Sequence, residues 1–212
     1  MVRTSKHSRR ALKTLLARIL NIRRLTIVVD NNPNREYILS LKNAVHACRR
    51  RNSNTLHNIS LNTGVISPPK LLLHAMGALR HLTLEWTIIS TEEIYFVLTA
   101  LPRETLEVLR IWNSSAVRPF GFAKFLTLLM RWQRLQTLDL RGPIVNPVLD
   151  RSLDSFCRTC TLNTFAIDWL CTEHIAMLKC NGLKTLHTRI HECVTPEWMT
   201  QLPPSFNIVC LN

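Results

Sequence analysis

The sequence predicts an α/β solenoid, with parallel strands on a concave face and helices on a convex face. A hexamer with apolar first, fourth and sixth positions recurs along the whole chain. The copies lie 21 to 34 residues apart, which leaves room for a helix between parallel strands. The segments between the copies carry apolar residues at helical spacing, so each unit is expected to be a strand followed by a helix.

The hexamer is clearest at Leu135 to Leu140, which reads L-x-x-L-x-L. Alternating side chains of a strand point to opposite faces, so the fourth and sixth positions should enter the core, while the third, fifth and seventh face outward. The copy at residues 183–188 is weaker because Thr188 replaces an apolar residue, and the copy that starts at Phe206 is degenerate. The eight copies are residues 22–27, 56–61, 79–84, 106–111, 135–140, 162–167, 183–188 and 206–211.

Helix signals occupy the intervals between the hexamers. Tyr37 to Arg51 places apolar residues on one helical face, and Ser90 to Glu93 has the S-x-x-E form of a capping box. Prolines in the first turn mark the helices that open near Ser67 and Thr195. The remaining expected helices are Ala11 to Leu20, Phe122 to Trp132, Leu149 to Cys160 and Thr172 to Cys180.

After the first interval the hexamers repeat every 25 residues on average, and the copy at Cys180 to Thr188 reads C-x-x-L-x-x-L-x-T. This pattern resembles the leucine-rich-repeat superfamily, ribonuclease-inhibitor-like class, and most of all the repeat region of F-box/leucine-rich-repeat proteins. The resemblance implies one domain over residues 1–212, a horseshoe arc of about seven to eight repeats. It also implies a role in substrate recognition. We expect residues 1–10, before the repeats, to form a basic, disordered tail.

The chain departs from that family in two respects. The asparagine usually found eight residues after the first leucine is absent, for example at Thr87, Ser114 and Pro143. We also expect no F-box before the repeats, because the first repeat begins within about ten residues of Met1. Docking onto a ubiquitin-ligase scaffold is therefore not expected of this chain.

The outward positions of the middle and C-terminal hexamers predict a protein-binding surface on the concave face. An exposed Trp beside arginines is typical of protein-binding hot spots. In the alternative interpretation, Trp112 packs under the following loop and the charges pair across strands. The predicted partner-binding residues are Glu85, Arg110, Trp112, Asp139, Arg141, Asp168, His187 and Arg189.

The net charge of +13 favours an acidic partner, and basic residues crowd the N-terminal end. The alternative function is that of an RNA- or other polyanion-binding leucine-rich-repeat protein, in which RNA or an acidic protein binds at this end. The competing interpretation is that cations at the end of a helix stabilise its dipole. Tyr37 is the one aromatic residue nearby, so base stacking is poorly supported. The candidate anion-binding residues are Arg9, Arg10, Arg23, Arg24, Arg49, Arg50 and Arg51.

Signals of catalysis or metal binding are weak. With five glycines, the chain has no G-x-G-x-x-G and no P-loop. Cys157-Arg-Thr-Cys160 could supply two zinc ligands, but it falls at the end of an expected helix, and the later Cys171, His174 and Cys180 have no paired spacing. Buried structural cysteines are the preferred interpretation. We expect no enzyme, no catalytic residues, no cofactor and no metal.

Several features bear on the compartment. No apolar run reaches the roughly 18–20 residues of a membrane span, and no secretory signal is recognisable. Scattered cysteines in apolar surroundings favour a reducing compartment, the cytoplasm or nucleus. Residues 1–29 hold eight Lys or Arg and no acid. A mitochondrial location, for an organellar assembly factor, therefore stays as the alternative.

Overall fold

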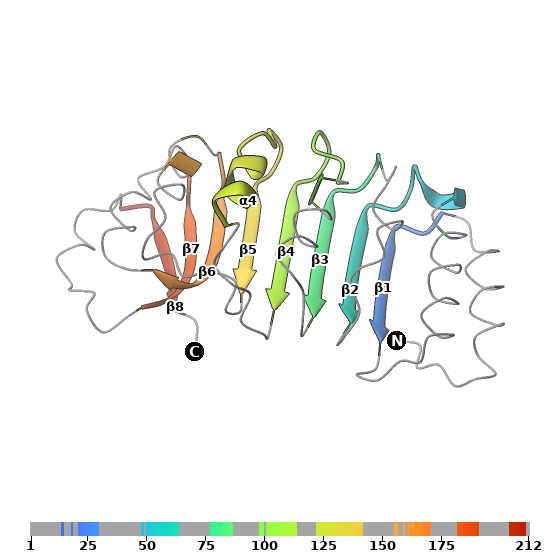
Figure 1. Cartoon of the computed structure of the whole chain (residues 1–212), viewed down its shortest axis with the longest axis horizontal. Coiled ribbons are helices and arrows are strands. Elements are labelled where there is room, and N and C mark those ends of the chain that lie inside the picture. Colours follow the sequence, from blue (N-terminus) through green and yellow to red (C-terminus); the bar gives the residue numbers. More distant parts are fainter. Residues whose placement is uncertain are drawn as a thin grey trace.

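The computed structural model shows one sheet of eight parallel strands, whose order across the sheet is their order along the chain (Figure 1). The strands are β1 (Arg24–Val29), β2 (Asn58–Thr63), β3 (His81–Trp86), β4 (Val108–Asn113), β5 (Thr137–Arg141), β6 (Thr164–Leu170), β7 (Thr185–Ile190) and β8 (Asn207–Cys210). The helix α4 (Phe122–Leu129) precedes β5. The residues that the structure describes are 14, 18, 21–29, 48, 50–63, 77–86, 98–99, 101–113, 122–141, 155–156, 159, 161–170, 182–190 and 204–210.

This architecture confirms the α/β class and the parallel sheet. Neighbouring parallel strands cannot be joined by a tight turn, so every connection is a crossover. In β1 to β7 each strand begins at the third residue of its hexamer, and those third residues are paired across the sheet, for example Val108 with Thr137. The hexamer therefore gives both the strand and its register.

The eighth strand corrects the sequence prediction by one residue. The degenerate hexamer at Phe206 would pair Ile208 with Thr185, but the structure pairs Asn207 with Thr185 and Ile208 with Leu186. A shift of one residue exchanges the two faces of a strand. Ile208 thus packs against the core in place of Val209, since it is the apolar side chain that lies beside Leu186.

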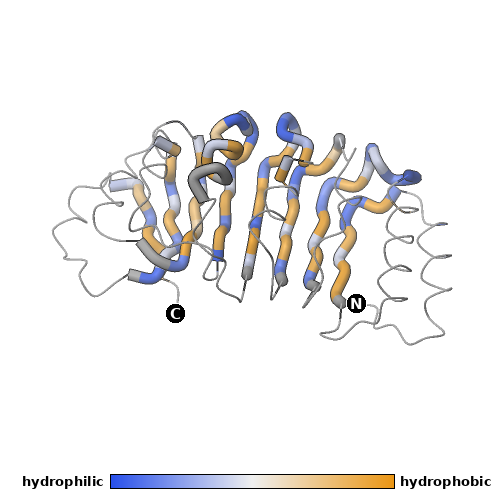
Figure 2. Tube along the Cα trace, in the orientation of Figure 1, coloured by the Kyte–Doolittle hydropathy of each residue, from blue (hydrophilic) through white to orange (hydrophobic). Residues whose placement is uncertain are grey.

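The core lies on one face of the sheet. Every side chain at the fourth and sixth hexamer positions of β1 to β7 is buried, and Leu126 and Leu129 of α4 belong to the same apolar cluster. Figure 2 shows these apolar positions as orange segments along each strand. Thr188, in the weaker copy, is also fully buried, and its hydroxyl donates to the carbonyl oxygen of Arg189 at 3.3 Å. That hydrogen bond lowers the cost of a polar group in the core.

A repeating hydrogen-bond pattern joins the points where the strands begin. The carbonyl oxygen at the second hexamer position accepts two amides from the next unit. For example, Arg80 accepts from Glu107 and Val108, at 2.8 and 2.9 Å. The same pair of bonds recurs from β1 to β7, so the strand starts form one continuous edge. We call this line of strand starts and the turns before them the entry edge.

Asn52 ties the start of β1 to the turn before β2. Its side-chain oxygen accepts the Ile22 amide at 2.9 Å, and its amide donates to the Cys48 carbonyl oxygen at 2.9 Å. The residue is 1% exposed, so these bonds satisfy polar groups that water cannot reach. Two consecutive units are thereby joined by a side chain as well as by the sheet.

Two of the seven cysteines lie in the described part of the chain, and both are free thiols. Cys48 is buried, as expected of a structural cysteine, and burial raises the pKa of its thiol, although contact with Asn52 opposes this. Cys210, at the end of the edge strand β8, is exposed, so the prediction of buried cysteines is wrong at that position. The two cysteines of the C-x-x-C, Cys157 and Cys160, lie outside the described residues.

The predicted helix at Phe122 to Trp132 is present, but it ends at Leu129. Residues 48, 50–52, 98–99, 155–156 and 159 are also helical, within or beside other expected helices. The expected helix starts near Ser67, Ser90 and Thr195, the segment from Thr172 to Cys180 and the tail at residues 1–10 lie outside the described residues. In the part of the chain that is described, no helix is long and apolar enough to cross a membrane.

Candidate functional site

The outward side chains of the sheet form a surface opposite the core, which we call the open face. It consists of the third, fifth and seventh hexamer positions of each strand. From β1 to β5 these positions are in register, so that Glu85, Trp112 and Arg141 are neighbours across three strands. Arg110 and Asp139 are likewise partners across β4 and β5. The structure therefore brings together five of the residues predicted from the sequence.

Asp139 and Arg141 make the strongest polar contact on the open face. The Arg141 Nε donates to Asp139 Oδ1 at 2.8 Å, and the Nη2 donates to Oδ2 at 2.7 Å. Two parallel charge-assisted hydrogen bonds fix the plane of the guanidinium. Residues two apart on a strand share one face, which is why this pair can form within β5. Asp139 is only 4% exposed, whereas the side chain of Arg141 is 41% exposed.

This pairing holds Arg141 over the ring of Trp112. The guanidinium carbon lies 4.8 Å from the ring centroid, which is cation–π geometry. The hydrogen bond to Asp139 raises the pKa of Arg141, and the charges of Asp139 and Asp168 act in the same direction, against the effect of burial. Arg141 is therefore held charged in a fixed orientation. Trp112 Nε1 is buried without a hydrogen-bond partner among the described residues.

Arg110 adds a second guanidinium to the cluster. Its Nε lies 4.0 Å from Asp139 Oδ2, and its side chain is 46% exposed. One buried carboxylate thus faces two half-exposed arginines. The alternative predicted from the sequence, that charges pair across strands, is partly right, because the Arg110 contact crosses strands. The closer pair, however, lies along a single strand. We call Arg110, Trp112, Asp139 and Arg141 the open-face cluster.

The remaining predicted residues lie toward the C-terminal end of the sheet, and one feature of their arrangement was not predicted. The repeat register places Asp168 and Arg189 at the same position, but a β-bulge between Ile167 and Trp169 pairs Arg189 with Trp169. Asp168 is the extra residue of that bulge, and its charge reaches Arg141. His187 keeps its register, beside Ala166.

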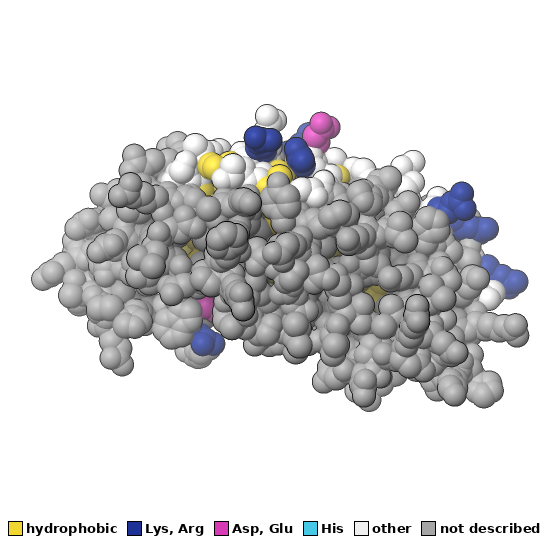
Figure 3. All heavy atoms as spheres, in the orientation of Figure 1, with side chains coloured by type: hydrophobic (Ala, Val, Ile, Leu, Met, Phe, Trp, Pro, Cys, Tyr) yellow, Lys and Arg dark blue, Asp and Glu magenta, His cyan; other side chains and the backbone are white. Residues whose placement is uncertain are grey.

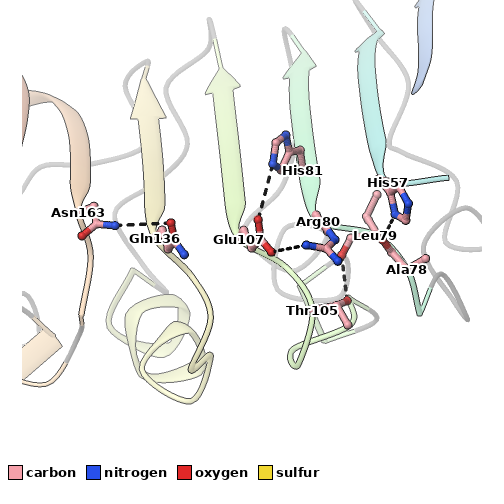
Figure 4. Close-up of polar contacts among 9 residues, drawn as sticks. All are labelled: His57, Ala78, Leu79, Arg80, His81, Thr105, Glu107, Gln136 and Asn163. Carbon is pink, nitrogen blue, oxygen red and sulfur yellow. Dashed lines mark hydrogen bonds and ion pairs between the residues drawn. The ribbon is translucent and has the colours of Figure 1, made fainter. Parts of the chain in front are cut away.

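Side chains at the second hexamer position line the entry edge, next to the hydrogen-bond pattern described above (Figure 4). Arg80 Nη1 lies 3.0 Å from Glu107 Oε1, and Asn163 Nδ2 donates to Gln136 Oε1 at 3.5 Å. His57 Nδ1 lies 2.8 Å from the Ala78 carbonyl oxygen. These contacts link neighbouring units at the surface.

The entry edge also carries a row of exposed cations, which the sequence analysis found only at its N-terminal end. In Figure 3, Lys and Arg side chains stand out along the upper rim, where the strands of Figure 1 begin. Aligning the turn before each hexamer would have revealed the other members. We call these residues the entry-edge cations: Arg23, Arg24, Arg50, Arg51, Arg80, Arg103, Arg131, Arg134 and Lys184.

Four of the candidate anion-binding residues lie in the described part of the chain, and all four are exposed. Arg23 and Arg24 are exposed at the start of β1, and Arg50 and Arg51 are exposed in the segment before β2. Arg9, Arg10 and Arg49 lie outside the described residues.

Within the described ranges, no group of three or more His, Cys, Asp or Glu side chains could hold a metal ion. The sequence candidates at Cys171, His174 and Cys180 lie outside those ranges. No protein-family model matches the sequence, and no curated protein matches it significantly.

Proposed function

We propose that this chain is a non-enzymatic protein-interaction module of the leucine-rich-repeat type, and that its open face binds a partner protein. The observation that carries the proposal is the open-face cluster, in which a buried carboxylate holds a guanidinium over a tryptophan ring. Tryptophan and arginine are the residues most enriched in binding hot spots. Their fixed geometry lowers the entropy lost when a partner binds.

The repeat assignment is supported by the periodic hexamer and by the single parallel sheet that it forms. Such an array exposes one face of its strands along its whole length, which suits recognition of an extended surface. We place the protein in the cytoplasm or nucleus, in keeping with its unpaired Cys48 and Cys210.

Arg141 keeps free hydrogen-bond donors for a partner protein although it is paired with Asp139. Its bonds to Asp139 use two of the five N–H donors of a guanidinium, and the side chain stays 41% exposed. Arg110 is 46% exposed beside it. A carboxylate or carbonyl oxygen of the partner can accept from these donors while an apolar group covers the remaining surface of Trp112.

The proposal is tested with Trp112→Ala in affinity purification with quantitative mass spectrometry. We expect at least one protein recovered by the wild type to be lost, and the purified partner to bind the variant at least about 30-fold more weakly, as removal of a hot spot of about 2 kcal/mol predicts. Thr127→Ala, on the exposed side of α4, is the control and should bind as the wild type does.

The melting temperature distinguishes binding from folding. We expect Trp112→Ala to keep a melting temperature close to that of the wild type, because Trp112 is only partly buried on the open face. Loss of binding together with unfolding would make Trp112 a structural residue, and Arg141→Gln then tests the surface without removing the ring. If neither variant loses a partner, the proposal is wrong.

A further inference from the structure

The entry-edge cations form a second charged surface, which shares only Arg24 with the open face. They occur at the starts of β1, β2, β3, β4, β5 and β7 and are all exposed. Neighbouring strands of a sheet lie about 4.8 Å apart, so positive charges recur along the edge at short intervals. In Figure 2, turns on this edge are among the hydrophilic segments of the trace.

Among the residues that the structure describes, acids neutralise little of this row. In the described turns and strand starts the acids are Glu104 and Glu107; Glu107 pairs with Arg80 at 3.0 Å, and its other oxygen lies 3.9 Å from His81 Nε2. The helix dipole favours cations only in the last turn of a helix, because its effect does not extend further along the chain. Arg23, Arg24, Arg80 and Lys184 lie at second or third hexamer positions, beyond that range.

The chemistry of the edge fits a polyphosphate chain better than a membrane. Val28, on the open face, is the one exposed large apolar side chain of the described residues, so the edge offers no apolar group for insertion into lipid. The linear arrangement of cations matches a ligand whose charges also lie on a line. Nucleic acids carry one phosphate per nucleotide and bind such rows through release of counterions.

We infer that the entry edge binds the phosphate backbone of a polynucleotide, which runs across the strand starts from the β1 end towards β7. The edge has no exposed Phe, Trp or Tyr side chain in its described part, so we expect binding to be independent of base sequence. This function is separate from partner binding on the open face and does not rest on it. It also extends the basic N-terminal end predicted from the sequence across the sheet.

The test compares two variants with the same change in net charge. The edge variant carries Arg103→Gln, Arg131→Gln and Arg134→Gln, in the turns before β4 and β5. The control carries Thr14→Glu, Val28→Glu and Asn62→Glu, none of which lies at a strand start or in the turn before one. Binding of fluorescein-labelled oligouridylate and oligothymidylate is measured by anisotropy over a range of salt concentrations. Melting temperatures show that both variants are folded.

We expect wild type and control to bind both oligonucleotides at low salt with similar affinity. The edge variant should bind more weakly. Its slope of log binding constant against log salt concentration should be shallower by about 2, because it lacks three arginines and each single-strand phosphate contact contributes about 0.7 to the slope. Equal loss in the two variants, or no binding by the wild type at low salt, overturns the inference. Tighter binding to polyglutamate or to phosphatidylserine vesicles than to the oligonucleotides also overturns it.

Discussion

Leu138→Ala is expected to lower the free energy of unfolding by about 3 kcal/mol, within the range of about 2–5 kcal/mol for buried leucines. Leu138 is at the fourth hexamer position of β5 and is 0% exposed. It lies between Leu109 of β4 and Phe165 of β6, so truncation leaves a cavity shared by three units. Urea denaturation followed by circular dichroism measures the change.

The control for this prediction is the preceding residue. Thr137 points to the open face and is only partly buried, so Thr137→Ala should change the free energy of unfolding by less than about 1 kcal/mol. Equal losses at Leu138 and Thr137 would mean that β5 does not have one buried and one open face. The hexamer pattern would then not predict which residues of β5 are buried.

Asp139→Ala is expected to destabilise the chain by about 2–3 kcal/mol, since it removes two charge-assisted hydrogen bonds at a buried site. This is less than the loss for a fully buried ion pair, because Arg141 is 41% exposed and can turn to water. Asp139→Asn should recover only part of the loss, since the amide keeps one acceptor but places a donor beside the guanidinium. The same urea titration measures both variants.

A double-mutant cycle isolates the pair from its surroundings. Asp139→Ala and Arg141→Ala, combined in one chain, should destabilise it by less than the sum of the single changes. Strict additivity would show that the contact between Asp139 and Arg141 contributes no stability. The orientation of Arg141 over Trp112 would then need another explanation.

Most of the sheet could be predicted from the sequence because strand and register depend on one strong signal. In β1 to β7 the fourth and sixth positions are all buried, including the polar Thr188, so the face of each residue follows from its place in the hexamer. The neighbourhood of Trp112, Arg110 and Arg141 followed from the same register. Their use as a binding site stays a prediction.

The structure departs from the sequence prediction where the hexamer pattern is weak or gives no information. At Phe206 apolar residues occupy both alternating sets of positions, so the hexamer does not decide the register, and the structure places Ile208 beside Leu186. The bulge at Asp168 adds one residue to β6 relative to β7, and a repeat pattern of fixed positions does not predict such an addition. The hydrogen bonds between Asp139 and Arg141 depend on the side-chain conformations of both residues, whereas the hexamer predicts only that both lie on the same face.

The most direct test of the central claim, that the open face binds a partner protein, is site-specific photo-crosslinking. Thr83, beside Arg110 on the open face, and Thr127, exposed on α4 across the core, are each replaced by p-benzoylphenylalanine. We predict crosslinks to one partner protein from position 83 and none to it from position 127. Crosslinks to that partner from position 127 alone would contradict the claim.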